Sequence, residues 1–190
     1  LVCYQKIRNL VTDDSLLISN PVKLAAYFIY INKTCFNGLW RENSLGRNNV
    51  PFNKKAVIKF NQEILNEASL RLEGSDIYVR DFDEIKDEEL DDKTFVYMDP
   101  PYVPLSPTSS FTSYTSKGFN LKDLDRLVVF CERLDKLGTK WMLCNSSSPL
   151  VYQRFSKWKI DEIQVHRFVK DITTKNAKRE KVKEVVVTNY

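Results

Sequence analysis

Four consecutive residues, Asp99, Pro100, Pro101 and Tyr102, together carry the groups needed to hold a planar amine. They follow the apolar run 95–98, which has the length and composition of a buried parallel strand. Proline lacks an amide donor and fixes its own φ angle, so the two prolines end the strand and hold the Asp99 carboxylate and the Pro100 carbonyl nearly rigid. Two such acceptors suit an exocyclic amine, which has two hydrogens to donate, and a base can stack on the Tyr102 ring.

This motif resembles the catalytic motif of amino-group DNA methyltransferases, which move a methyl group from S-adenosylmethionine to a base nitrogen. Aspartate at the first position resembles the adenine-specific members. The resemblance implies that Asp99 and the Pro100 carbonyl accept the two amino hydrogens of a flipped adenine, while Tyr102 helps to form its pocket. A proline-terminated strand turn with a packed tyrosine is the simpler alternative.

The loop after the motif is polar, rich in Ser and Thr, and without helical or strand periodicity. In the Dam-like family of adenine methyltransferases, a similar loop lines the pocket that receives the flipped adenine. By this resemblance, Phe111 and Tyr114 contact the DNA. The same two rings could instead anchor a long loop to the core.

A second distinctive segment, residues 30–52, is dense in amides, glycine and aromatic rings. Arginine can bind guanine through two hydrogen bonds, asparagine can pair with a base edge, and an aromatic ring can wedge between base steps. The segment closely resembles the target-recognition region of Dam-type enzymes, which suggests GATC as the recognised sequence. The implied DNA contacts are Phe36 as the wedge, Asn37 in the space or facing the partner left by the flipped base, Leu39 and Pro51 on thymine methyls or base edges, and Arg41 on guanine.

The composition of this segment also has a purely structural explanation. A β-hairpin could use its Asn and Gly residues to satisfy turn geometry, and Arg41 could simply be solvated. Gly38 and Gly46 are expected to serve the backbone in either case. The family often has tyrosine at the position of Phe36, so a wedge formed by this ring would lack a hydroxyl contact.

Asp81 and Phe82 follow a short apolar segment, residues 77–80, which we expect to form a strand. In methyltransferases an acid and its neighbour after this strand hold the adenine ring of S-adenosylmethionine, so the resemblance implies a cofactor site that includes Asp81, Phe82 and Asp99. Alternatively, Asp81 caps the next helix. The five glycines include no Gly-x-Gly, although this class needs a glycine-rich turn at the cofactor. We therefore expect the chain to be the carboxyl-terminal two thirds of a longer enzyme, with the main cofactor loop outside it.

Helical and strand patterns alternate after the recognition segment, which predicts an α/β fold. Asn20 and Asn120 are placed to cap helices, and Gly74 is placed to end one. Asn145 would lie near Asp99 at one edge of the sheet. The expected helices cover residues 21–31, 55–73 and 121–137, and the expected strands cover residues 77–80, 95–98, 141–144, 160–169 and 185–190.

The predicted fold is an incomplete Rossmann-like S-adenosylmethionine methyltransferase domain, with a doubly wound, mostly parallel sheet and an antiparallel last strand. A small, mainly helical DNA-recognition domain with a β-hairpin precedes it. The expected division gives residues 1–54 to recognition, in a domain that is itself incomplete, and residues 55–190 to catalysis.

Composition limits the function less than the motifs do. A net charge of +4 permits a DNA partner without requiring one. Four cysteines without Cys-x-x-Cys spacing and a single histidine give no reason to expect a metal site or a disulfide framework. The basic stretch 170–183 could contact phosphates or be an ordinary solvated loop.

We expect a monomeric cytoplasmic enzyme, bacterial or phage-encoded, that binds double-stranded DNA and no membrane. The alternative is a DNA-binding protein or fragment without catalysis, because the main cofactor loop is expected outside this chain.

Overall fold

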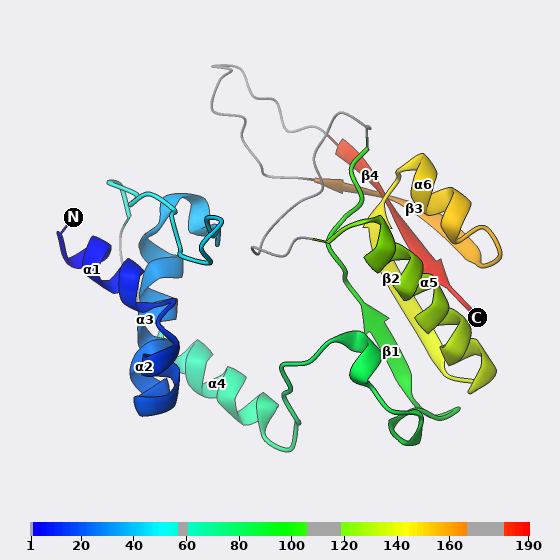
Figure 1. The fold of residues 1–190 in the computed structure, drawn as a ribbon, viewed down its shortest axis with the longest axis horizontal. Coiled ribbons are helices and arrows are strands. Elements are labelled where there is room, and N and C mark those ends of the chain that lie inside the picture. Colours follow the sequence, from blue (N-terminus) through cyan, green and yellow to red (C-terminus); the bar gives the residue numbers. More distant parts are fainter. Residues whose placement is uncertain (1, 57–60, 106–118, 167–180) are drawn as a thin grey trace. The chain divides into compact units, whose positions relative to one another are not determined.

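The computed structural model describes residues 2–56, 61–105, 119–166 and 181–190. The chain divides into two compact units, of which the first covers Leu1–Val79 and the second begins at Arg80 (Figure 1). The predicted division into domains after residue 54 stays a prediction.

The first unit is mainly helical. Its elements are α1 (Val2–Leu10), α2 (Asp14–Ser19), α3 (Pro21–Thr34), the short 3₁₀ helix η1 (Phe36–Gly38) and α4 (Gln62–Leu72). Asn20 caps α3 as predicted, because its side chain accepts a hydrogen bond from the Lys23 amide. A small core joins α1 and α3 to the segment after η1, and its buried residues are Tyr4, Val11, Ile31, Cys35 and Val50.

The helix predicted over residues 55–73 is shorter in the structure. α4 begins only after Asn61, whose side chain accepts a hydrogen bond from the Ile64 amide and so fixes the start. The predicted end is confirmed, since Gly74 follows the C-cap with a φ of +80°. None of the residues of α4, all of which are described, is buried.

The second unit contains a four-stranded sheet in the order β1-β2-β4-β3. Two short 3₁₀ helices, η2 (Phe82–Glu84) and η3 (Asp87–Glu89), precede the sheet, whose strands are β1 (Phe95–Met98), β2 (Lys140–Ser146), β3 (Lys159–His166) and β4 (Lys181–Thr188). β1 and β2 are parallel, and β4 lies between β2 and β3, antiparallel to both. The mixed α/β class and the antiparallel last strand are therefore confirmed.

The pairing of the described sheet corrects the expectation that it is mostly parallel. β1, β2 and β3 run in one direction, but β4 is inserted between two of them instead of closing the sheet at an edge. A single antiparallel strand in the interior makes both of its pairings antiparallel, so only β1 and β2 pair in parallel among the described strands.

Residues 77–80 were predicted as a strand, and this prediction is wrong. The side chain of Ile77 is 75% exposed and Val79 is fully exposed. An extended segment becomes a strand only when its backbone groups pair with a neighbouring strand, and none of the described strands pairs with this segment. The apolar composition of residues 77–80 does not show whether a neighbouring strand is available to pair with them.

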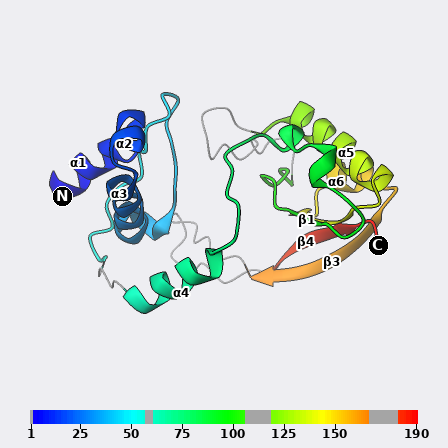
Figure 2. The same ribbon diagram turned by 90° about the horizontal axis from the view of Figure 1, so that it is seen from below.

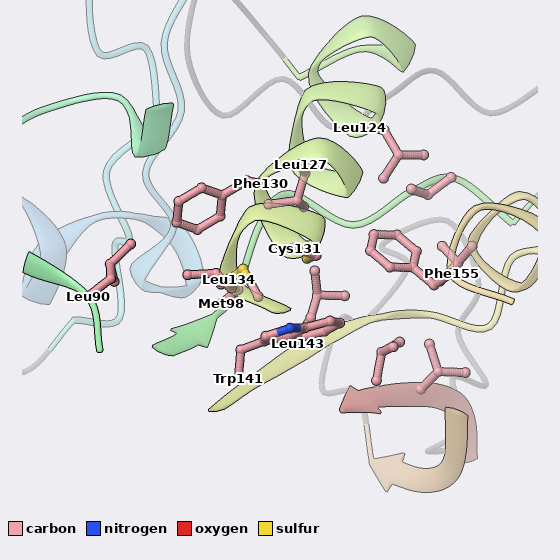
Figure 3. Packing of buried hydrophobic residues seen from close by; sticks show 14 residues of the cluster. Leu90, Met98, Leu124, Leu127, Phe130, Cys131, Leu134, Trp141, Leu143 and Phe155 are labelled. Carbon is pink, nitrogen blue, oxygen red and sulfur yellow. The ribbon is translucent and has the colours of Figure 1, made fainter. Parts of the chain in front are cut away.

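One face of the sheet is covered by α5 (Leu121–Lys136) and α6 (Pro149–Arg154), as Figure 2 shows. Asn120 caps α5 as predicted, in a capping box with Asp123, whereas α6 was not predicted. The inward side of α5 packs on β2 and on the end of α6 (Figure 3). The residues buried in this layer include Leu124, Leu127, Cys131, Leu134, Trp141, Leu143 and Phe155.

Candidate active site

Asp99 follows β1 directly and is exposed at the carboxyl end of that strand. Within the described residues, no hydrogen bond or ion pair engages its carboxylate. The negative charge is nevertheless close enough to Tyr97 and Tyr102 to contribute to a raised pKa of each phenol. Asp99 is therefore an accessible acceptor on a rigid strand end, which the proposed grip on an amine requires.

Tyr102 is half-buried, and its hydroxyl donates a hydrogen bond of 2.9 Å to Oε2 of Glu184 on β4. Burial is the main reason that the pKa of the Tyr102 phenol is raised, and the Glu184 carboxylate adds to the effect. The phenol thus remains a donor at neutral pH. The contact between Glu184 and Tyr102 was not predicted, because nothing in the sequence indicates a contact between residues 82 positions apart.

The backbone after Tyr102 is fixed to β2. The amide of Val103 donates to Oδ1 of Asn145 at 2.9 Å, and the Ser146 hydroxyl donates to the Val103 carbonyl. Val103 and Asn145 are both buried, with 3% and 0% of their surface exposed. The prediction that Asn145 lies near the motif is confirmed, and its role is to hold the backbone that follows the two prolines.

The amide nitrogen of Asn145 has no partner among the described residues, although it is buried. Its oxygen is used twice, by the amides of Val103 and Ser146. Residues 102 and 103 are thus attached to two strands of the sheet, through Glu184 on β4 and through Asn145 and Ser146 on β2.

Asp81, predicted at the cofactor, already has partners in the protein. Its Oδ1 accepts a hydrogen bond from the Asp83 amide, which starts η2, and lies 2.5 Å from Nη2 of Arg126 on α5. The Asp83 amide first, and Arg126 second, lower the pKa of the Asp81 carboxyl. Arg126 also binds Asp83 and Asp123. Asp81 therefore caps a short helix, as the alternative reading of the sequence expected.

Phe82 is half-buried and packs against Phe130, with ring centroids 5.6 Å apart. The guanidinium of Arg126 lies over the Phe82 ring, 4.8 Å from its centroid. One face of this ring is thus covered by protein. Of Asp81 and Phe82, the former has the group better suited to bind a cofactor. Its Oδ2 has no hydrogen-bond partner among the described residues and could accept a hydrogen bond from an amino or hydroxyl group.

Residues 35–52 of the first unit fold back on themselves, with isolated antiparallel bridges at Cys35–Phe52 and Glu42–Asn48. The Asn43 side chain accepts hydrogen bonds from the amides of Leu45 and Arg47, and thereby closes the turn. Gly38 and Gly46 adopt φ angles of +66° and +71°, as expected for residues that serve the backbone.

The predicted DNA contacts in this segment differ in exposure. Asn37, Leu39, Arg41 and Pro51 are exposed, whereas Phe36 is half-buried and packs against the core of the first unit. Asn37 has a φ of +57°, which asparagine tolerates better than most residues. Their contact with DNA stays a prediction, and Phe111 and Tyr114 lie outside the described residues.

Arg41 is held by its own segment. Its Nε donates to Oδ1 of Asn49 at 2.7 Å, which orients the guanidinium and leaves Nη1 without a partner among the described residues. Asn49 is therefore a support for Arg41 that the sequence did not indicate.

Of the basic stretch 170–183, only Lys181 and Lys183 are described, and both lie in β4. Lys183 forms an ion pair of 2.8 Å with Glu162 on β3. None of the described helices is long and apolar enough to cross a membrane. In the same ranges, no three His, Cys, Asp or Glu side chains are grouped as metal ligands.

Comparison with known proteins adds independent information. The model of the D12 class N6 adenine-specific DNA methyltransferases matches residues 4–170. A type II methyltransferase of Methanocaldococcus jannaschii, M.MjaIII, is 42% identical over 90% of this chain and 59% of its own length. M1.LlaDCHI of Lactococcus lactis is 36% identical over 98% of this chain and 66% of its own length, and the DNA adenine methylase of Escherichia coli K12 is 29% identical over 88% and 59%.

The chain thus spans about three fifths to two thirds of the length of these relatives. The family match covers most of both compact units, including the whole of the motif at Asp99 and the segment around Arg41. The chain belongs to the D12 class of N6 adenine-specific DNA methyltransferases, and within that class it is Dam-like.

Proposed function

We propose that this chain forms the base-gripping part of an S-adenosylmethionine-dependent enzyme that methylates N6 of adenine in duplex DNA. The observation that carries the proposal is the strand end at Asp99. An exposed carboxylate with no partner among the described residues is followed by a backbone that is attached to β2 and β4. A rigid acceptor next to an aromatic ring suits a flipped adenine.

Asp99 and the Pro100 carbonyl are proposed to accept the two hydrogens of the adenine amino group. The lone pair of that nitrogen is delocalised into the ring and is a weak nucleophile. Acceptors on both hydrogens favour a tetrahedral nitrogen and orient its lone pair, which amounts to positioning plus electrostatic stabilisation. Tyr102 would stack on the extruded base and keep water away from it.

S-adenosylmethionine, when bound, supplies a methyl group attached to a positively charged sulfur. From this chain, Asp81 is proposed to hold an amino or hydroxyl group of the cofactor through Oδ2, with Phe82 beside it and Asp99 at the reacting end. The glycine-rich turn is expected outside these residues, because this sequence has no Gly-x-Gly. The Rossmann-like arrangement remains part of the proposal for the complete protein.

Residues 30–52 are proposed to select the target, with GATC as the sequence. Arg41 is exposed and oriented by Asn49, which fits a side chain that binds guanine. Phe36 is proposed as the wedge, and Asn37, Leu39 and Pro51 as further contacts. Such an enzyme would act in the cytoplasm of a bacterium or of a phage-infected cell.

The test is methyl transfer by the complete protein that contains this chain. Labelled S-adenosylmethionine is incubated with duplexes that differ only in GATC or GTAC at the centre, and the nucleosides are analysed by mass spectrometry. We expect N6-methyladenine in the GATC duplex alone. Equal methylation of both duplexes would disprove the specificity only. Duplex binding without any cofactor binding by calorimetry, and without any product, would favour the non-catalytic alternative.

A further inference from the structure

The Tyr102 side chain is held at both ends. Near its backbone, the Asn145 and Ser146 side chains fix both polar groups of the next residue, Val103. At the far end, the hydroxyl donates to Glu184. Backbone anchoring alone still leaves an aromatic side chain several rotamers about its first two bonds. The contact with Glu184 removes that freedom and sets the direction of the ring.

The sheet brings Glu184 to this position. β4 enters between β2 and β3 antiparallel to β2, so its first half lies beside the last residues of β2, and Glu184 is the register partner of Ser146. The carboxylate and the backbone anchors of Val103 are therefore on adjacent strands at the same edge. A phenol bound to a carboxylate in a half-buried setting makes a stronger hydrogen bond than a neutral pair does.

A second tyrosine and glutamate pair in the same unit provides a matched comparison. Tyr152 on α6 donates to Glu162 on β3 at 2.6 Å, and Glu162 also binds Lys183. Neither residue belongs to the motif or to the strands that hold it. The two pairs share the same chemistry and differ in place, so they separate a local function from a general contribution to stability.

We propose that Glu184 is a positioning residue for adenine methylation, acting through the Tyr102 hydroxyl to orient the ring against the extruded adenine. This inference rests on the proposed function. On this proposal, the Tyr102 hydroxyl contributes to catalysis by orienting the ring, although it does not take part in the methyl transfer itself. It also places the control of base stacking on β4, in a residue far from the motif in sequence.

Single variants of the complete protein test the pair in steady-state methylation with a GATC duplex. Glu184→Ala is expected to lower kcat about tenfold, the loss of one charge-assisted hydrogen bond. Glu184→Gln, whose amide oxygen can still accept from the phenol, is expected to stay within about threefold of the wild type. Tyr102→Phe is expected to match Glu184→Ala, while Glu162→Ala and Tyr152→Phe should leave kcat unchanged.

Because Tyr102 and Glu184 both have further interactions, a double-mutant cycle is needed to isolate their bond. If Glu184 acts through the hydroxyl, Tyr102→Phe with Glu184→Ala loses no more than about twice what the worse single variant loses. Independent losses that multiply to about a hundredfold would overturn the inference. So would an unchanged kcat in both single variants.

The stacking of the target base can be measured directly, and a residue that only stabilises the fold is not expected to change it. With 2-aminopurine at the target adenine, loss of the oriented ring is expected to brighten the emission of Glu184→Ala at unchanged duplex affinity and unchanged melting temperature. Unchanged emission would contradict a positioning role. Failure of the proposed function is separate, because it would appear as a wild-type protein with no methyl transfer at all.

Discussion

Two aspartates in the second unit, Asp81 and Asp99, each follow an extended segment, but their carboxylates have different surroundings. Asp99 directly follows a paired strand and is exposed. Its carboxylate has no hydrogen bond or ion pair in the described part of the chain. Asp81 ends a segment that pairs with no described strand, and one of its oxygens is bound by the Asp83 amide and by Arg126. Among the described residues, the Asp99 carboxylate has no partner, whereas one oxygen of Asp81 is part of a hydrogen-bond network within the protein.

The difference shows that position after an extended run does not by itself define a reactive acid. What distinguishes Asp99 is the support behind it, because β1 pairs with β2 and the next residues are bonded to β2 and β4. A rigid strand end can leave its acid unsatisfied, since other bonds hold the backbone. At Asp81 the carboxylate itself starts η2, so it contributes to the local structure.

The largest effect is expected from removing the open carboxylate. In the complete protein, Asp99→Ala should lower kcat for GATC methylation by at least about 10²-fold, comparable to the loss of one preorganised transition-state partner. The matched variant Asp81→Ala should change kcat at saturating cofactor much less. Near-normal turnover of Asp99→Ala would remove that residue from the mechanism and end the contrast between the two acids.

In the first unit, Arg41 resembles Asp81 in that its side chain is already hydrogen-bonded within the protein, to Asn49. Arg41→Ala is expected to weaken binding to a GATC duplex by about 1–3 kcal/mol, the discrimination of one bidentate contact with guanine. Fluorescence anisotropy with GATC and scrambled duplexes measures it. Arg47→Ala, an exposed arginine of the same turn, is the control and should weaken both duplexes equally. Equal losses for Arg41→Ala would identify a phosphate contact.

A smaller effect is expected at Asp81. Asp81→Asn keeps the shape and one acceptor oxygen, so the Kd of S-adenosylmethionine should rise about tenfold, the loss of one hydrogen bond to a charged group. Calorimetry of the complete protein provides the value. An unchanged Kd would mean that Asp81 only stabilises the local protein structure. Of the two aspartates, Asp99 alone would then be proposed to bind a ligand.

The smallest effect concerns stability against acid. Because the pKa of Asp81 is lowered in the folded protein from an ordinary value of 3.8, its ionised form stabilises the fold. This contribution is complete above pH 3.8 and is lost as the pH falls through the folded pKa. Urea unfolding of the wild type and Asp81→Asn should therefore differ at pH 5 and converge toward pH 2. A difference that grows toward low pH would contradict the sign.

Sequence was sufficient where the determinants are local. Asn20 and Asn120 cap helices through amides within three residues, and Gly74 ends α4 through its own φ angle. It failed at residues 77–80, because a strand depends on a partner elsewhere in the chain. The role of Glu184 at Tyr102 was missed for the same reason, since only the register of β2 and β4 brings it there.

The insertion of β4 between β2 and β3 has a consequence for how the site is made. Until β4 has paired, β2 is an edge of the described sheet, and the hydrogen bond from Tyr102 to Glu184 has not formed. Pairing across such a separation in sequence is slow to form relative to local helices. During synthesis, the helices of the first unit can fold before Glu184 on β4 is available to bind Tyr102. The contact between Tyr102 and Glu184 is therefore expected to form late, when β4 is in place.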